Sequence, residues 1–579
     1  MTKSLLLEAK QRGFGDKVLA EIKGTKEEVI RQRRLKLGIR PVAKQIDTLA
    51  GEFEASTNYL YLTYHGNTND IIPLGHKAAM VIGSGPYCIG SSVEFDWCAV
   101  NTVKALSDQG ISNIMVNSNP ETVSTDFDRS DRLYFEELTL ERMRDIADFE
   151  TPNGIVVSVG GQIANNLALP LMKANYTILG TSPLQIDRAE DRQKFSAMLT
   201  KLGIDQPEWQ EITTAKKAKE FATKVGYPIL VRPSYVLSGG AMNVVKNEEE
   251  MELYLEEAVR LSPDHPVVIS RFISNAKEIE IDGAAKNGEL QVYAVSEHIE
   301  NAGVHSGDAT VVFPAQHLNL ETIREAKYIT EEIIKNLNIT GPFNIQFLSK
   351  GKELKVIECN VRASRSFPFV SKVSGYNFIK IAVESMLGVD SSKVRNTLDY
   401  KHVGVKSPQF SYNRLKGADP VAGVEMASTG EVAYIGDCLE EAFYASWLAT
   451  DQQVTDKTLL LSLPDAQQGE FVTEVAALVA QKWKVYCTPE THLYMQTYGI
   501  ETIHLHSAEQ AITRNQVALM ISVPSLKTDS SYKVRRLAID NHLPLVTNAK
   551  IARLLLQCLG MKNLLPKKPK AWQDYSTSE

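Results

Sequence analysis

Between residues 77 and 185, short runs of apolar and β-branched residues alternate with longer stretches of helix-forming residues. The short runs, at 78–82, 114–116, 154–159 and 176–179, have the length of strands. Two parallel neighbouring strands need a crossover between them, and a helix usually supplies it, so this alternation predicts a parallel sheet covered by helices. We expect a Rossmann-like domain at 77–185.

The chain is long enough for several further domains. Its 579 residues exceed what one hydrophobic core supports, since domains usually hold about 100 to 200 residues. We expect a helical segment at 1–76, a mainly antiparallel α+β domain at 186–390 that opens with a helix at 185–202, a connecting segment at 391–452, and a smaller parallel α/β domain at 453–579. The predicted fold class is therefore multidomain α/β.

Charge and hydropathy exclude two classes of partner. Lysine and arginine number 63 against 70 aspartates and glutamates, a net charge of −7, and no long basic block is present, so we expect no nucleic-acid partner. No apolar run reaches the length of about 18 residues that a membrane span needs, and the N-terminus has no secretion signal. Six scattered cysteines without a CxxC pair indicate a reducing compartment. We expect a cytoplasmic protein, and a mitochondrial location stays open because a transit peptide could have been removed.

One predicted hairpin carries oxygen-bearing side chains at alternate positions. If Ser349 pairs near Glu353 across the turn, then Gln346, Glu358 and Asn360 share one face. Mg²⁺ takes such oxygen ligands, whereas zinc favours His and Cys. On the pattern alone, a polar strand face without a metal is the more frequent outcome, so both interpretations stay open.

Cationic side chains occur where a polyphosphate would need them. Arg232 ends an apolar strand before a glycine-containing loop, and Arg362 and Arg365 follow the predicted metal ligands. One guanidinium group can donate two parallel hydrogen bonds to a phosphate group, and the loop at 234–240 could close over a bound polyphosphate. The chain contains neither GxxxxGK(S/T) nor the protein-kinase signatures, so we expect a different ATP-binding fold.

Seven sequence strings occur together in the order and spacing of one known family. They are NPETVSTD (119–126), GGQ (160–162), GTSP (180–183), DRAEDR (187–192), RPSYVL (232–237), EHIENAGVHSGD (297–308) and FPFVSK (367–372). They resemble the carboxy-terminal half of the large subunit of carbamoyl phosphate synthetase. The resemblance covers nearly the whole chain. It implies the end of a helical oligomerisation domain, a Rossmann-like pre-ATP-grasp domain, an ATP-grasp domain and a C-terminal methylglyoxal-synthase-like regulatory domain, with the upstream synthetase half missing.

The resemblance also implies roles for individual residues. Gln346, Glu358 and Asn360 match the family's metal ligands, which favours the metal interpretation of the hairpin. The residues expected around the nucleotide and the transferred phosphoryl group are Arg192, Arg232, Arg271, Glu278, His305, Ser306 and Arg362. Within this set, Arg192 and Arg232 match phosphate-binding arginines, Glu278 matches the acid that holds the ribose, and Arg271 matches a position that the family places near the adenine. Arg232, His305 and Arg362 are the catalytic candidates.

The activity implied is the ATP-dependent phosphorylation of carbamate to carbamoyl phosphate, as used in pyrimidine and arginine metabolism. The implied cofactors are ATP and Mg²⁺ or Mn²⁺, with K⁺ as an additional candidate. Carbamate would derive from bicarbonate and ammonia, and the expected partners are the missing amino-terminal synthetase half, a glutaminase subunit or domain, and further copies of this chain. Two alternatives stay open: a nucleotide-sensing regulatory half without catalysis, and another ATP-grasp carboxylate ligase.

The last predicted domain contains a candidate effector site. Thr488 is placed as the N-cap of a helix with Pro489 at its first position, and free amides at a helix N-terminus bind anions. The regulatory domain that the sequence resembles uses threonines matching Thr488 and Thr491 to hold an anionic effector, and Arg535 and Arg536 could assist. Residues 522–527 lack the asparagine-rich stretch of the acetylglutamate-regulated type, which favours an anionic nucleotide.

Overall fold

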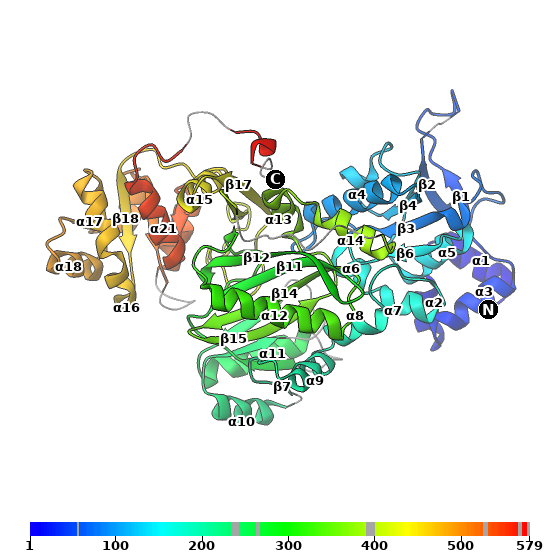
Figure 1. Cartoon of the computed structure of the whole chain (residues 1–579), viewed down its shortest axis with the longest axis horizontal. Coiled ribbons are helices and arrows are strands. Elements are labelled where there is room, and N and C mark those ends of the chain that lie inside the picture. The colour runs from blue at the N-terminus through cyan, green and yellow to red at the C-terminus, as the bar shows by residue number, and fades with distance from the viewer. Residues whose placement is uncertain are drawn as a thin grey trace.

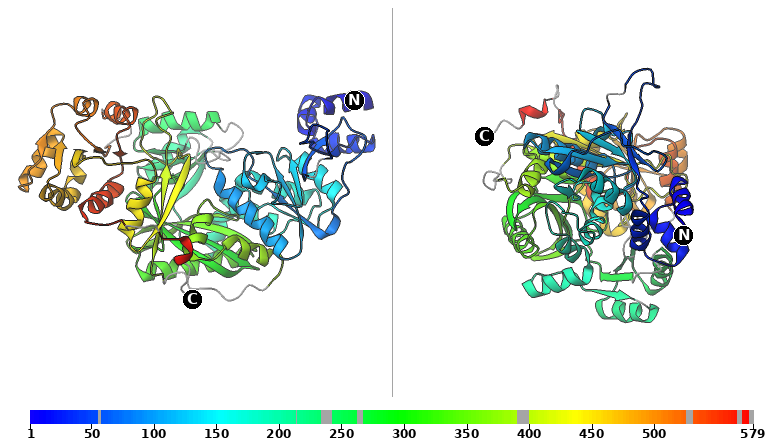
Figure 2. Two further views of the ribbon diagram at one scale, coloured as in Figure 1. Left: turned by 90° about the horizontal axis from the view of Figure 1, so that it is seen from above. Right: turned by 90° about the vertical axis from the view of Figure 1, so that its right-hand side faces the viewer.

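The structure is a computed structural model of the chain. Its described residues are 1–54, 57–212, 214–232, 242–261, 267–389, 400–524, 531–565 and 570–575. These ranges contain four sheets. The N-terminal helices lie at one end of the long axis and the C-terminal parallel sheet at the other, with the largest sheet between them (Figures 1 and 2). The predicted loop at 234–240 lies outside the described residues.

Three N-terminal helices pack on the neighbouring domain through buried charges. The helices are α1 (Lys3–Gln11), α2 (Asp16–Lys23) and α3 (Glu27–Lys36). The Arg34 guanidinium, which is fully buried, lies 2.9 Å from Asp16 and 3.2 Å from Asp145 of α5 (Leu140–Glu150). Moving the helices away from α5 would leave buried charges unpaired, which is strongly destabilising. These contacts therefore hold the helices in one position on the neighbouring domain.

The first sheet has six strands in the order β1-β2-β5-β4-β3-β6. The strands are β1 (Val42–Gln45), β2 (Tyr59–Thr63), β3 (Ala78–Ile82), β4 (Ser112–Asn117), β5 (Arg132–Phe135) and β6 (Gly154–Val156). Besides α5, its helices are α4 (Val93–Asp108), α6 (Gly161–Asn165) and α7 (Ala168–Lys173). All pairings except β1 with β2 are parallel, as the alternation predicts.

Two expectations for this region were wrong in detail. The segment 1–76 is not helical throughout, because β1 and β2 belong to the sheet; in β2, Leu60 and Leu62 are buried and Tyr61 is exposed, a period-two pattern that the helical interpretation overlooked. The run at 176–179 forms only an isolated bridge between Ile155 and Ile178, since the chain turns at Gly180, where φ is 100°.

The predicted helix at 185–202 is two helices. α8 (Pro183–Glu190) ends before Asp191, whose carboxylate accepts from the Lys194 amide at 3.0 Å and caps α9 (Arg192–Leu202). A small antiparallel sheet follows in the order β7-β10-β8-β9. Its elements are β7 (Trp209–Ile212), α10 (Ala215–Val225), β8 (Ile229–Arg232), β9 (Asn243–Val245), α11 (Glu248–Leu261) and β10 (Val267–Arg271).

The central sheet has seven antiparallel strands in the order β15-β14-β11-β12-β13-β16-β17. They are β11 (Lys277–Lys286), β12 (Glu289–Asn301), β13 (Val311–Phe313), β14 (Gly341–Lys350), β15 (Glu353–Asn360), β16 (Val403–Gln409) and β17 (Gly430–Gly436). The accompanying helices are α12 (Leu320–Asn336), α13 (Phe367–Ser374), α14 (Phe378–Met386) and α15 (Leu439–Leu448). The predicted connecting segment at 391–452 thus supplies two strands of this sheet.

One face of the central sheet is apolar at one end of its strands and carries carboxylates toward the other end. On β11, Ala284 is buried in an apolar cluster with residues of α4 and α14, whereas Asp282, Glu280 and Glu278 follow at alternate positions on the same face. The carboxylates therefore line the part of the face that the apolar cluster leaves free, and the candidate site lies there.

The C-terminal sheet has five parallel strands in the order β20-β19-β18-β21-β22. The elements are β18 (Thr458–Ser462), α16 (Asp465–Gln468), α17 (Val472–Ala480), β19 (Lys484–Cys487), α18 (Pro489–Thr497), β20 (Ile503–His504), α19 (Ala508–Thr513), β21 (Leu519–Ser522), α20 (Tyr532–Asp540), β22 (Leu545–Val546) and α21 (Ala549–Gly560). The predicted smaller parallel α/β arrangement is present. None of the helices in the described ranges is long and apolar enough to cross a membrane.

Candidate active site

The hairpin of β14 and β15 does not pair in the predicted register. Ser349 pairs with Leu354, one residue beyond Glu353. Continued unchanged, this pairing would put Glu358 on the opposite face from Gln346, because a slip of one residue turns every side chain to the other face.

A β-bulge restores the shared face. Phe347 pairs with Val356, but Gln346 pairs with Glu358, so Ile357 is an additional residue on β15. The Ile357 carbonyl accepts a hydrogen bond from Arg192 Nη1 at 2.5 Å. Gln346, Glu358 and Asn360 therefore do lie on one face, for a reason that the alternation alone did not contain.

The three predicted metal ligands form a cluster on one sheet face, where Gln346 lies opposite Glu358 and two further residues, Asn344 and Ser306, bond to the ligands. Asn360 Nδ2 donates to Glu358 Oε1 at 2.9 Å and to Asn344 Oδ1 at 3.3 Å, and Gln346 Nε2 donates to Ser306 Oγ at 3.3 Å. Asn344 was not among the predicted site residues. It precedes Gln346 by two positions on the same strand, so the alternation of side chains along a strand predicts that it lies on the same face.

The donor set of this cluster suits a hard cation. It offers one carboxylate and amide oxygens, and within the described ranges no group of three or more His, Cys, Asp or Glu side chains could hold a metal ion. Mg²⁺ accepts few protein oxygens and fills its octahedron with water and phosphate oxygens, so these residues fit Mg²⁺ bound together with a nucleotide.

An arginine lies next to Glu358. Arg232, the last residue of β8, places Nη1 3.5 Å from Glu358 Oε2. Burial raises the pKa of Glu358, but Arg232, the hydrogen bond from Asn360 and Arg362 outweigh it, and the net pKa is lowered. Glu358 is therefore ionised at neutral pH, as a metal ligand must be.

Arg192 is held close to this cluster. Its guanidinium stacks over the Trp209 ring, 5.4 Å from the centroid, and it donates to the Ile357 carbonyl. Burial and the neighbouring charge of Arg232 lower its pKa to about 10, so it remains cationic at neutral pH. In this structure Arg192 stabilises the bulge that aligns the cluster.

His305 and Ser306 reach the cluster from the segment after β12. Ser306 accepts from Gln346, and His305 Nδ1 accepts from the Gly307 amide at 3.0 Å, so the neutral imidazole carries its proton on Nε2. Burial lowers the pKa of His305, although Asp308 and Glu358 act against it. His305 can therefore donate a hydrogen bond without adding a charge.

Glu278, predicted to hold a ribose, lies beside a buried histidine. Its Oε2 is 3.8 Å from His298 Nδ1, and His298 Nε2 is 3.0 Å from Glu280. Burial raises the pKa of Glu278 to about 7, with a further contribution from Glu280 that His298 opposes.

The raised pKa makes a prediction about stability. Between pH 4.5 and 7 the folded chain keeps a proton on Glu278 that the unfolded chain has lost, so the free energy of unfolding falls as pH rises through this range. The stability associated with protonated Glu278 is therefore fully present below pH 4.5 and lost above pH 7. We expect Glu278→Gln, which cannot titrate, to gain about 3 kcal/mol relative to wild type between pH 5 and 8 in urea unfolding. The exposed Glu289→Gln is the control, and a constant difference between Glu278→Gln and wild type across this pH range would contradict the assignment.

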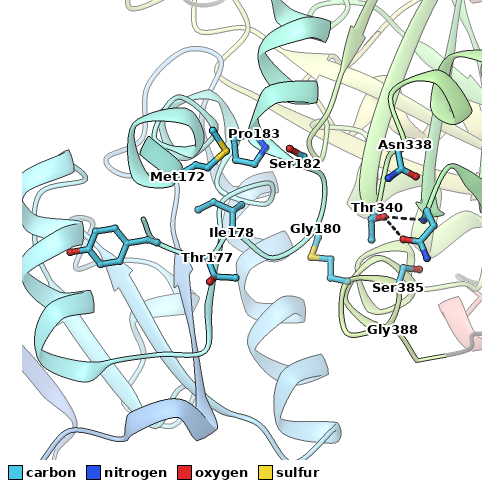
Figure 3. Close-up of a pocket in the computed structure, with 13 residues that line it drawn as sticks. Met172, Thr177, Ile178, Gly180, Ser182, Pro183, Asn338, Thr340, Ser385 and Gly388 are labelled. Carbon is cyan, nitrogen blue, oxygen red and sulfur yellow. Dashed lines mark hydrogen bonds between the residues drawn. The ribbon is translucent and has the colours of Figure 1, made fainter. Parts of the chain in front are cut away.

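Arg271 is not brought to the cluster. It pairs with Glu208 at 3.3 Å and lines a cavity of about 460 Å³ with Ile273, Lys350 and Lys355. A larger cavity of about 510 Å³ lies between the first sheet's domain and the central sheet, with Ile178, Gly180 and Ser182 on one side and Asn338 and Thr340 on the other (Figure 3). Its lining has no charged side chain, so it lacks the cations that a triphosphate requires.

The predicted effector residues lie at the start of α18. Thr488 is the N-cap with Pro489 at the first helical position, as predicted, and Thr488 Oγ1 donates to Thr491 Oγ1 at 3.0 Å. Thr491 is buried and also bonds the backbone of Leu463. Arg535 and Arg536 are both buried. Arg535 binds Asp419, and Arg536 binds the carbonyl groups of residues 412, 415 and 418.

Two family models match adjoining parts of the chain. The carbamoyl phosphate synthase preATP-grasp domain matches residues 75–188, and the carbamoyl-phosphate synthase L chain ATP-binding domain matches residues 191–392. The first range includes the parallel strands β3 to β6, and the second includes the predicted metal ligands Gln346, Glu358 and Asn360.

Curated relatives match nearly all of the chain but only part of themselves. Multifunctional protein URA2 of Saccharomyces cerevisiae is 50% identical over 579 residues, covering 96% of this chain and 26% of that protein. Carbamoyl-phosphate synthase (ammonia), mitochondrial, of Rattus norvegicus is 45% identical over 580 residues, covering 96% of this chain and 39% of that protein. The chain thus spans well under half the length of either relative.

Solved structures share the fold at low identity. The biotin carboxylase domain of Hydrogenobacter thermophilus 2-oxoglutarate carboxylase, in complex with MgADP, ADP and bicarbonate, has a TM-score of 0.52 and 16% identity over 64% of this chain and 89% of that chain. Biotin carboxylase of Campylobacter jejuni, in complex with β,γ-ATP, has a TM-score of 0.51 and 15% identity over 64% of this chain and 90% of that chain. This similarity concerns the fold alone.

Proposed function

This chain belongs to the carbamoyl phosphate synthase family, and we propose that it phosphorylates carbamate with ATP to form carbamoyl phosphate and ADP. The observation that carries the proposal is the cluster of Gln346, Glu358 and Asn360 on one sheet face, with Arg232 3.5 Å from Glu358. An oxygen cluster next to arginines is what a metal-bound polyphosphate needs.

The residues of this site would act by positioning and by neutralising charge. Carbamate already carries a negative oxygen, so attack on the γ-phosphorus needs no general base. Gln346, Glu358 and Asn360 would hold Mg²⁺ or Mn²⁺, which neutralises phosphate oxygens when bound. Arg232 and Arg362 would bind the phosphoryl oxygens through their N–H groups, and His305 would donate from Nε2. Binding of K⁺ stays a prediction.

The proposal includes the division of the chain. We place an oligomerisation-type segment at 1–76 that is helical only in α1 to α3 and that adds β1 and β2 to the neighbouring sheet. A pre-ATP-grasp domain follows at 77–185, an ATP-grasp domain at 186–390, a segment completing the synthetase unit at 391–452, and a methylglyoxal-synthase-like domain at 453–579. The four sheets and the two matched ranges support this order.

Carbamate must reach this site from another reaction. We propose that a first synthetase unit forms it from bicarbonate and ammonia and that a glutaminase supplies the ammonia. Products for pyrimidine or arginine synthesis, a homo-oligomeric state and a cytoplasmic location stay predictions; the Rattus norvegicus relative is named mitochondrial.

The test of the proposed function is the reverse reaction, which needs neither ammonia nor a second synthetase unit. The purified chain is expected to form ATP from MgADP and carbamoyl phosphate, measured with a luciferase-coupled assay. No ATP from a folded protein that binds ADP would overturn the catalytic proposal and favour the nucleotide-sensing regulatory interpretation.

We also propose that an anionic nucleotide binds at Thr488. At about ten times its dissociation constant, UMP should contribute about 1.4 kcal/mol and raise the melting temperature of the C-terminal domain at 453–579 by about 5 °C. Thr488→Val should abolish this shift. Thr497→Val removes a hydroxyl from the other end of the same helix, where it bonds the Tyr494 carbonyl, and should keep the shift. Equal shifts in both variants, or none in wild type, would contradict the site.

A further inference from the structure

A chain of polar contacts links the candidate catalytic arginine to the neighbouring domain. Arg362, which follows β15, donates from Nε to Gln162 Oε1 at 2.9 Å and from Nη1 to the Ala363 carbonyl at 3.0 Å. Gln162 lies on α6 and donates from Nε2 to Asn166 Oδ1 at 2.9 Å and to Glu190 Oε1 at 3.2 Å. The segment after Arg362 is held in the same way, since the Ala363 amide donates to the Ser158 carbonyl at 2.8 Å.

Two glycines bring Gln162 to this place. A Cβ on Gly160 would lie 2.3 Å from the Gly83 carbonyl oxygen, so only glycine permits the close approach of α6 to the end of β3. Gly161 has φ of 70°, which favours glycine as well. The backbone thus fixes the start of α6 against the sheet, and the Gln162 side chain extends from it to Arg362.

The chemistry of the contacts requires an amide at this position. A guanidinium only donates and a carboxylate only accepts, so a group lying between them must accept at one end and donate at the other. The Gln162 amide does this in one orientation, because the reversed amide would set N–H groups against Arg362 and an oxygen against Glu190. Glu190 is itself held by Asn165 Nδ2 at 2.5 Å.

This arrangement orients Arg362 without neutralising it. Among the described residues, its hydrogen bonds are those to Gln162 and to the Ala363 carbonyl, and no carboxylate lies within ion-pair distance. Its Nη2 group and its charge stay available for a phosphoryl oxygen. A carboxylate in place of the Gln162 amide would pair with the guanidinium directly and compete with phosphate.

We propose that Gln162 is a positioning residue that aims Arg362 at the transferred phosphoryl group, with Glu190 fixing the direction of its amide. This inference rests on the proposed function and assigns to the pre-ATP-grasp domain a part in orienting an arginine of the ATP-grasp domain. Movement of one domain against the other would therefore move the guanidinium as well.

The experiment compares Gln162→Ala with Gln162→Glu in ATP synthesis from MgADP and carbamoyl phosphate. Gln162→Ala should lower kcat about tenfold, and Gln162→Glu about a hundredfold, the range typical of partners that orient active-site ligands. Gln193→Glu is the matched control: Gln193 also donates to a carboxylate, Glu211 at 2.7 Å, but it is exposed and does not contact Arg362.

A binding measurement separates this inference from the proposed function. By calorimetry, Gln162→Glu should weaken binding of a non-hydrolysable ATP analogue about tenfold and leave ADP affinity within twofold, because Arg362 is placed beside the transferred phosphoryl group only. If this pattern is found while wild type makes no ATP, the positioning role stands and the proposed reaction falls. If wild type makes ATP while both variants stay within twofold of it, or Gln162→Glu is the milder change, the positioning role is overturned.

Discussion

Glu358→Ala is expected to reduce ATP synthesis from MgADP and carbamoyl phosphate about a thousandfold while leaving the fold intact. Glu358 is the only carboxylate among the three proposed metal ligands, and the loss of a metal that neutralises phosphate oxygens costs several kcal/mol in the transition state. The fold should tolerate the change, since Arg232, the ion partner of Glu358, keeps 45% of its side chain exposed and would stay solvated.

The control for this variant is Glu353→Ala. Glu353 lies on the same strand, but its side chain is 70% exposed and its ion partner is Lys355 at 4.0 Å, so its removal should leave activity unchanged. Melting curves of both variants should coincide with wild type. Substantial turnover by Glu358→Ala at saturating Mg²⁺ would refute the metal assignment.

Arg362→Lys is expected to lower kcat about a hundredfold with little change in the KM for MgADP. Removal of one preorganised donor to developing charge typically costs about 100- to 1000-fold, and here only the transferred group loses its contact. Lysine keeps the charge, but its single ammonium cannot bind Gln162, the Ala363 carbonyl and a phosphoryl oxygen in the fork geometry of arginine.

The same substitution at Arg324, an exposed residue of α12, should have no effect on kcat. A value of kcat for Arg362→Lys within threefold of wild type would show that the charge alone suffices. In that case the fork geometry, and with it the contact to Gln162, would have no catalytic role.

Much of the fold follows from local pattern. The run at 78–82 is β3, and its neighbours alternate with helices because a parallel strand needs a crossover of that length. The pattern of apolar residues was less informative about where one helix ends and the next begins, and about short strands. The break between α8 and α9 depends on one capping aspartate. The strands β1 and β2 are short, and they join the sheet through the pairing of β2 with β5, whose residues lie 74 positions later in the chain.

The sequence by itself determined which residue types the site contains. Oxygen side chains at alternate positions of one hairpin predict a shared face, and the arginines that follow predict phosphate contacts. The first inference uses the alternation of side chains along a strand, and the second uses the closeness of residues along the chain. Both can be read from the sequence without the structure.

Only the tertiary structure decided how these groups meet. The bulge at Ile357 brings Glu358 to the face of Gln346, and the guanidinium that binds its carbonyl comes from α9 of another segment. Likewise Gln162 meets Arg362 although 200 residues separate them, because the segment after β15 lies against the chain before α6, where the Ala363 amide donates to the Ser158 carbonyl. Side-chain period fixes the face of a residue only while the register continues, and register shifts and contacts between domains are set by packing across the whole chain.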